Sequence, residues 1–112
     1  MGDETSRTEI PPGTLYMLIL KTLSRGPQHG YGISEHIQQM SEEVLQVEEG
    51  SLYPALQRML IKGWVTAEWG QSENNRRARF YSLTASGRKQ LATEISEFEK
   101  VMRAITRVIQ PA

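Results

Sequence analysis

Residues 50–83 read GSLYPALQRMLIKG, WVTAEW, GQSENNRR and ARFYSL in succession, and the change of pattern along this stretch decides the fold. Gly63 ends a predicted helix as its C-terminal cap, and Pro54, which lacks a backbone donor, requires that helix to begin within one turn upstream. The second and fourth blocks are β-prone and flank a loop rich in Gly, Ser and Asn, which predicts a β-hairpin with a long tip. The first block predicts the helix from about Gly50 to Lys62, because apolar residues recur there at helical spacing: Leu52, Leu56, Met59 and Leu60.

Two further helices are predicted upstream of this stretch. The first follows Thr14 as its N-cap and ends before Gly26-Pro27, and the second spans Gly30 to about Met40. Residues 41–47 alternate only weakly, which fits either an extended connection or a one-bridge strand. Three helices followed by a hairpin is the order of a winged helix-turn-helix. The predicted fold class is therefore mainly α with a small β-hairpin, and a long final helix is added to it.

The composition limits the classes of protein that need to be considered. The 112 residues fit one domain, and the 13 basic and 13 acidic residues cancel, so any electrostatic argument must come from local charge. The absence of cysteine excludes disulfides, thiol nucleophiles and thiolate metal sites. No apolar run is long enough for a membrane span and the amino terminus is not signal-like, so we expect a cytoplasmic protein. Residues 1–13 are expected to be a flexible arm ahead of a domain over residues 14–83.

Residues 84–112 are expected to form a dimerisation helix. Thr84 can cap a helix that runs to about Ile109, where Pro111 forbids its continuation. At about 1.5 Å per residue this helix is roughly 39 Å long, which is more than a small core covers on one side. Its apolar residues are spaced four, three, four, three and four apart, which is a heptad seam for a second copy of the chain. The seam comprises Leu91, Ile95, Phe98, Met102, Ile105 and Ile109.

The basic residues near the predicted hairpin favour contact with nucleic acid. Five of them lie between Asn74 and Thr93 with no acid among them, which gives a local charge of +5: Arg76, Arg77, Arg79, Arg88 and Lys89. A solvated hairpin is the usual explanation of such a charge run. Beside a three-helix pattern, however, we favour contact with DNA phosphates.

In a helix-turn-helix the second helix of the pair lies in the major groove, and its first residues meet base edges and phosphates. The candidates on this helix are Ser51, Tyr53, Gln57 and Arg58. Two of them have equally simple structural explanations. Tyr53 fits a partly buried ring with its hydroxyl at the surface, and capping alone would explain Ser51.

The start of the second predicted helix, Gly30-Tyr31-Gly32, is unusual. Two glycines there give up helix propensity, so something approaches the backbone closely. A neighbouring helix is slightly favoured over a bound phosphate. Tyr31 is the candidate for a second phosphate donor.

Metal and enzyme chemistry find little support in the sequence. His29 and His36 stand seven residues apart without cysteine, which matches no usual ligand pattern, so capping or solvent-facing roles are expected. Acidic residues that precede a helix, such as Glu48 and Glu49, complement its dipole and need no cation. No nucleophile–base pair, phosphate loop or catalytic carboxylate pair is recognisable. We therefore predict no enzyme activity, no cofactor and no metal.

Two blocks of the sequence resemble a known family. They are Gly-Ser-Leu-Tyr-Pro-Ala-Leu at residues 50–56 and a Tyr-x-Leu-Thr-x-x-Gly pattern at residues 81–87, and in this order and spacing they are specific together. With Gly-Pro and His-Gly-Tyr-Gly-Ile in residues 26–33 and Gly-Trp at 63–64, the chain resembles the PadR family of bacterial transcriptional regulators. The resemblance covers about residues 14–109.

The resemblance implies a winged helix-turn-helix, a dimer built from the final helix, and usually repression that a small molecule or another signal relieves. It implies that Tyr31, Ser51, Tyr53 and the hairpin arginines contact DNA. The single long final helix is similar to that of the short-tailed branch. Some relatives hold flat drugs between tryptophans on the dimer helices, whereas here that helix offers only Phe98, which argues against such binding.

Two hypotheses follow. In the first, the chain is a sequence-specific regulator that binds double-stranded DNA at an inverted-repeat operator as a homodimer. In the second, it is a winged-helix module that docks another protein and does not bind DNA. The acid-free basic run favours the first hypothesis, because a protein-docking module has no need of it.

Overall fold

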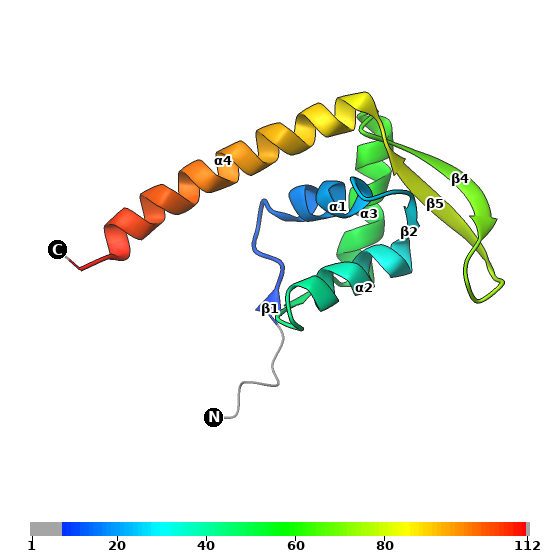
Figure 1. Ribbon diagram of the computed structural model, residues 1–112, viewed down its shortest axis with the longest axis horizontal. Helices are drawn as coiled ribbons and strands as arrows, with labels where there is room; N and C mark the ends of the chain where they lie inside the picture. The colour runs from blue at the N-terminus through cyan, green and yellow to red at the C-terminus, as the bar shows by residue number, and fades with distance from the viewer. Residues whose placement is uncertain (1–7, 112) are drawn as a thin grey trace.

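The computed structural model describes residues 8–111, and its elements follow the predicted order (Figure 1). Figure 1 shows α1, α2 and α3 grouped against a hairpin, while α4 runs away from this body as a long arm. The molecule is therefore elongated, with extents of 54 × 37 × 22 Å. The elements are β1 (Thr8–Glu9), α1 (Leu15–Leu23), β2 (Gln28–His29), α2 (Gly30–Met40), β3 (Leu45–Gln46), α3 (Glu49–Ile61), β4 (Val65–Gln71), β5 (Arg77–Leu83) and α4 (Ala85–Ile109).

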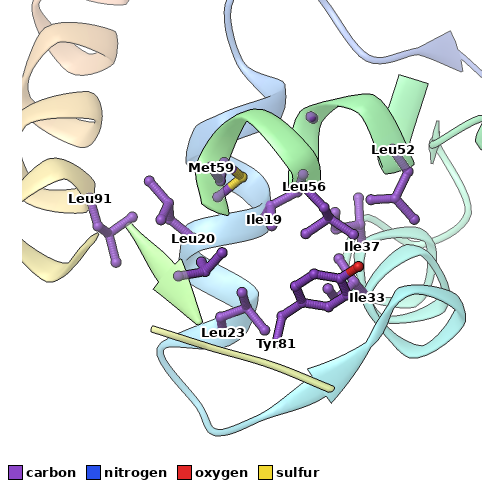
Figure 2. Packing of buried hydrophobic residues seen from close by; sticks show 12 residues of the cluster. Ile19, Leu20, Leu23, Ile33, Ile37, Leu52, Leu56, Met59, Tyr81 and Leu91 are labelled. Atoms are coloured by element: carbon purple, nitrogen blue, oxygen red, sulfur yellow. The ribbon is translucent and has the colours of Figure 1, made fainter. Parts of the chain in front are cut away.

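The core lies where the apolar faces of α1, α2 and α3 meet the inner side of the hairpin (Figure 2). Ile19, Ile33 and Leu56 come from these three helices and are fully buried. Tyr81 of β5 and Leu91 of α4 close the core from two other sides. The core residues of the helices lie on their inward faces because they recur at helical spacing in the sequence. Three helices packed on a hairpin confirm the predicted winged-helix fold class.

The helix boundaries lie close to the predicted ones, with corrections at two helix starts. Thr14 occupies the N-cap position of α1, but its hydroxyl donates to the Pro11 carbonyl oxygen (2.8 Å) instead of capping the helix. Helix α3 begins after Glu48, so Ser51 lies in its first turn and does not cap it. Pro54 consequently lies inside α3, slightly more than one turn from its start.

The hairpin is longer and its tip is shorter than the sequence indicated. Strands β4 and β5 pair from Val65↔Leu83 out to Gln71↔Arg77, so the hairpin tip comprises residues 72–76. Strand β2, which sequence reasoning missed, pairs with the other edge of β5 and makes the sheet three-stranded. A two-residue strand carries too little pattern to be recognised from sequence.

The segment expected to be a flexible arm is partly paired. Thr8 and Glu9 form β1 and lie parallel to Leu45 and Gln46 of β3, and Ile10 packs against the core. The arm prediction is therefore wrong for residues 8–10, while residues 1–7 lie outside the described part of the chain. The same pairing decides the open question on residues 41–47 in favour of a short strand.

Helix α4 starts as predicted. The Thr84 hydroxyl oxygen accepts from the Gly87 amide (2.9 Å), and the hydroxyl donates to the Gly63 carbonyl oxygen (2.7 Å), which ties α4 to the end of α3. A Cβ on Gly87 would collide with the backbone carbonyl of Trp64. Glycine is therefore required at residue 87 by a close backbone approach.

The six residues of the heptad seam fall into two groups. Leu91 is buried and Ile95 packs against the core, so the body of the same chain uses them. The expectation that Leu91 faces a partner is corrected, because the first turns of α4 lie directly on the body. The other four seam residues lie on the far half of α4 (residues 98–109) and are exposed by 39%, 42%, 45% and 74%: Phe98, Met102, Ile105 and Ile109.

Candidate nucleic-acid interface

The outward face of α3 carries the four side chains that the sequence assigned to DNA. All four residues are exposed, because the buried residues of α3 occupy its opposite side. Tyr53 and Gln57 are four residues apart and share one flank of this face, whereas Ser51 and Arg58 are seven apart and share the other. The face therefore has two separate flanks.

Tyr53 is held against the start of α2. It is 45% exposed, and its hydroxyl lies so close to Gly30 that a Cβ there would overlap it. Partial burial, with smaller contributions from Glu49 and Tyr81, raises the pKa of Tyr53. The hydroxyl therefore stays protonated at neutral pH and can donate a hydrogen bond. The ring packs on α2 while nearly half of the residue remains accessible.

Packing explains both glycines at the start of α2. Gly30 makes room for Tyr53, and a Cβ on Gly32 would overlap the Gln28 side chain, whose Oε1 accepts from the His29 amide (2.9 Å). His29 is the N-cap of α2, because its Nδ1 accepts from the Gly32 amide (3.0 Å). The expected capping role is thus confirmed for His29.

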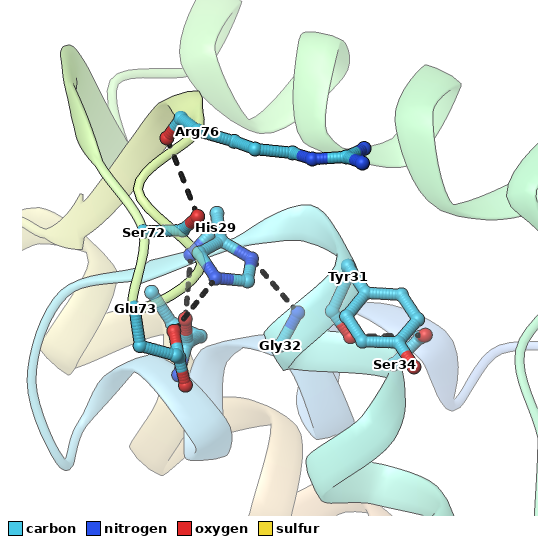
Figure 3. Close-up of polar contacts among 8 residues, drawn as sticks. His29, Tyr31, Gly32, Ser34, Ser72, Glu73 and Arg76 are labelled. Atoms are coloured by element: carbon cyan, nitrogen blue, oxygen red, sulfur yellow. Dashed lines mark hydrogen bonds and ion pairs between the residues drawn. The ribbon is translucent and has the colours of Figure 1, made fainter.

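A cleft of about 1000 Å³ lies between α2 and the hairpin tip. Tyr31, which is 67% exposed, lines its helix side, and Arg76 lines its hairpin side (Figure 3). Arg77 lines the hairpin side as well. Arg25 and Gln39 line the same cleft, and sequence reasoning did not single them out. The fold therefore brings three of the predicted DNA contacts to one polar concave surface.

Aromatic rings position two of the hairpin arginines. The Arg77 guanidinium carbon lies 4.6 Å from the ring centre of Trp69, and that of Arg79 lies 5.9 Å from the ring centre of Tyr81. Both arginines remain exposed. Because the rings restrict these long side chains, less conformational entropy would be lost on contact with a phosphate.

The five basic residues do not form one patch. Arg76, Arg77 and Arg79 lie on the tip and on β5, whereas Arg88 and Lys89 lie at the start of α4. At the rise of a strand, Arg77 and Arg79 lie roughly 20 Å and roughly 13 Å from Leu83 at the far end of β5, and α4 begins only after that end. Figure 1 shows the tip and the start of α4 at opposite ends of β5. The acid-free run in the sequence thus corresponds to two separate surfaces.

The Ser51–Arg58 flank of α3 is less suited to phosphates. Arg58 Nε donates to the Tyr16 hydroxyl (2.6 Å), so its guanidinium is engaged with α1. Glu48 and Glu49 are exposed at the start of α3, where they complement the helix dipole as expected. Glu49 stands four residues before Tyr53 and acts on its pKa, so the acids do not separate the two flanks, and the engagement of Arg58 is what favours the Tyr53 flank.

The cleft is also lined by His36. Burial, with the Arg25 charge adding to it, lowers the pKa of His36, so this ring is neutral at pH 7. In residues 8–111 there is no group of three or more side chains that could hold a metal ion. Over the same residues, no helix is long and apolar enough to cross a membrane.

One pair of polar residues was missed by sequence reasoning. His29 Nε2 lies 3.6 Å from Glu73 Oε1 on the hairpin tip, and the His29 ring meets Phe80 edge-on with 5.3 Å between ring centres. The two partners are far apart in the sequence, so no spacing rule connects them. The position of His29 directly before a helix start is the one signal the sequence offered.

Three packed helices, an exposed face on the third and a hairpin with a basic tip define a winged helix-turn-helix protein. Residues 19–93 match the profile of the PadR-like family of transcriptional regulators, so the chain belongs to this family. The family consists of regulators and not of enzymes, which confirms the expectation that the chain is not an enzyme.

Known structures and sequences agree with this assignment. A transcriptional regulator from Clostridium thermocellum superposes with a TM-score of 0.80 at 26% identity, covering 88% of this chain and 95% of that one. A PadR-like transcriptional regulator from Bacillus cereus gives a TM-score of 0.75 at 25% identity, covering 89% and 95%. An uncharacterized protein from Lysinibacillus sphaericus is 27% identical over 99 residues, which are 88% of this chain and 91% of that protein.

Proposed function

We propose that the chain binds double-stranded DNA in a sequence-specific manner and regulates transcription. The observation that carries this proposal is the continuity of one surface: the Tyr53–Gln57 flank of α3 adjoins the start of α2, which adjoins the cleft with Arg76 and Arg77. A helix of this kind fits the major groove, and a hairpin beside it reaches the flanking phosphates.

The roles of the individual residues follow from this placement. Tyr53 and Gln57 face the bases or their phosphates, and Tyr31, Arg76 and Arg77 hold the backbone that passes the cleft. Arg79 stands next to this group on β5. Ser51 and Arg58 are outer contacts on the second flank, and Arg58 must leave Tyr16 to reach DNA.

We also propose that the protein is a homodimer through α4. The four exposed seam residues keep the spacing of four, three and four, which is that of a coiled-coil interface. In a dimer with a two-fold axis, the exposed seam residues of each copy would cover those of the other. Such a dimer presents two copies of α3 about 34 Å apart, so the operator is an inverted repeat with half-sites about 10 base pairs between centres, or a multiple of that.

Repression relieved by a small molecule or another signal is the mode of regulation that membership of the PadR-like family favours. Such an effector would not bind between tryptophans at the dimer centre, because neither Trp64 nor Trp69 belongs to α4. Trp64 packs edge-on against Tyr16, and Trp69 lies under Arg77. A promoter fused to a reporter, with and without the protein, tests the direction of regulation.

Selection from a random duplex library tests DNA binding. The unmodified protein should enrich an inverted repeat, and Gln57→Ala should lose much of this preference, because Gln57 lies on the flank that faces the groove. Gln90→Ala is the matched control, since Gln90 bonds to Glu94 on α4, away from the proposed interface. If no duplex is enriched and none binds even at low salt, the protein-docking alternative is favoured instead.

A further inference from the structure

The hairpin tip is connected to the start of α2 through a polar contact between His29 and Glu73. The Glu73 carboxylate oxygen Oε1 lies 3.6 Å from His29 Nε2 (Figure 3). The His29 side chain is only 13% exposed, and its ring is held by the Gly32 amide at Nδ1 and by the edge-on contact with Phe80. Because Nδ1 accepts a hydrogen bond, the proton of the neutral ring is on Nε2, which points toward Glu73.

The tip that carries Glu73 is closed on itself. The Asn75 amide donates to the Ser72 carbonyl oxygen (2.9 Å), and the Ser72 amide donates to the Arg76 carbonyl oxygen (2.8 Å). A link at Glu73 therefore fixes the whole tip and with it the base of the Arg76 side chain. A backbone hydrogen bond, and then the one from His29, lower the pKa of Glu73, so its carboxylate is charged at neutral pH.

We propose that His29 and Glu73 form a latch that holds the hairpin tip in position for DNA binding, with His29 as the positioning residue. This inference rests on the proposed function, and it adds a residue that touches no DNA. One imidazole caps α2 on one side and holds the tip on the other, so it fixes the width of the cleft between Tyr31 and Arg76. A released tip must be ordered on binding, which weakens the phosphate contacts of its arginines.

Two variants of Glu73 separate the latch from simple charge effects. Glu73→Gln and Glu73→Ala both remove a negative charge beside the arginines, which by itself strengthens DNA binding. Glutamine keeps an oxygen that accepts from His29, whereas alanine does not. We expect the alanine variant to bind DNA about two- to five-fold more weakly than the glutamine variant, as for an exposed pair. Equal affinities of the two variants would overturn the latch.

His29→Asn completes a double-mutant cycle with the two Glu73 variants. Asparagine is a good N-cap and keeps α2 intact, but it is too short to reach the tip. In this background the glutamine and alanine variants should bind DNA equally, because there is no latch left to break. A difference that persists in the His29→Asn background would assign the effect to another partner of Glu73 and overturn the role of His29.

NMR relaxation of the tip amides in the free protein gives a readout independent of DNA. Residues 72–76 should become more mobile in Glu73→Ala than in Glu73→Gln, with thermal unfolding showing that both variants fold. A tip that is equally ordered in both variants contradicts the latch. If the tip loosens as expected but the unmodified protein binds no DNA, the proposed function fails while the link between His29 and the tip is upheld, so the two failures are distinguishable.

Discussion

Two exposed surfaces of this molecule differ in polarity and in how far neighbouring residues hold their side chains in place. The proposed DNA surface is polar and basic, and its side chains rest on packed neighbours: Tyr53 on Gly30, Arg77 on Trp69. The far half of α4 carries an apolar stripe, and the body of the chain leaves Met102 and Ile105 of this stripe exposed by 42% and 45%. The first surface has the charge and shape that the proposed contact with a polyanion needs, whereas the second is an exposed apolar stripe, which the proposed dimer would cover.

The comparison teaches that exposure alone does not identify a binding surface. One long helix begins in the core with Leu91 and ends in solvent with Ile109, although both residues belong to one unbroken heptad pattern. The neighbours of each residue decide what it does. The predictions below test this division, from the largest expected effect to the smallest.

Met102→Glu should abolish the proposed dimer, with association weakened by more than about 100-fold, because a charge would be forced into an apolar interface in both copies. Light scattering at micromolar concentration measures the mass. Ala104→Glu adds the same charge on the opposite side of the helix and should leave the dimer intact. An unmodified protein that is monomeric at this concentration ends the dimer proposal.

Leu91→Ala should lower the free energy of unfolding of each protomer by about 2–3 kcal/mol, because it leaves a cavity in the core. Ile105→Ala should leave protomer stability unchanged. Both are measured by urea denaturation in the Met102→Glu background, so that dimer dissociation does not contribute. If the two substitutions have equal effects there, the two halves of α4 do not differ in the way the structure indicates.

The sequence predicted those parts of the molecule that depend on local pattern. Helical spacing placed Ile33 and Leu56 inside, and Thr84 was identified as the cap of α4. The parts that were missed depend on contacts between distant residues. Strand β1 exists because Thr8 meets Leu45, and Arg58 is engaged because Tyr16 of α1 lies beside it.

The candidate site shows the same limit. The hairpin arginines and the residues of α3 were found because charge and motif are visible in sequence. Their grouping was not, since β5 separates Arg88 from Arg77 and the fold brings Tyr31 to the cleft instead. The glycines of α2 were recognised as a sign of close approach, but only the structure identifies Tyr53 and Gln28 as the approaching groups.

Replacing Arg76, Arg77 and Arg79 together by glutamine should weaken binding to all duplexes and lower the salt slope by about 0.9 for each lost phosphate contact. Base preference should be retained, because these residues lie off α3. Replacing Arg88 and Lys89 by glutamine is the control for the separate group and should change the slope less. An unchanged slope in the triple variant shows that the hairpin does not contact phosphates.

Tyr53→Phe should weaken binding to the selected operator by about 1 kcal/mol, the net contribution of one hydrogen bond, with folding and dimerisation intact. The ring still packs against Gly30, so only the hydroxyl is tested. Fluorescence anisotropy against the operator and an unrelated duplex measures the difference. If Tyr53→Phe and Gln57→Ala both bind the operator like the parent protein, α3 does not read DNA.

The shape of α4 has a mechanical consequence for the proposed dimer. From Met102 to Ala85 the helix is a rigid lever roughly 25 Å long, with the dimer contact as its fulcrum and the winged domain at its end. A change of about 10° in the angle at which two such levers cross moves the two winged domains in opposite directions, by about 4 Å relative to each other. Against a required separation of about 34 Å, a shift of that size misaligns one domain with its half-site. An effector would therefore need to change only the crossing angle of the two helices at the dimer contact, far from any base pair, to release the DNA.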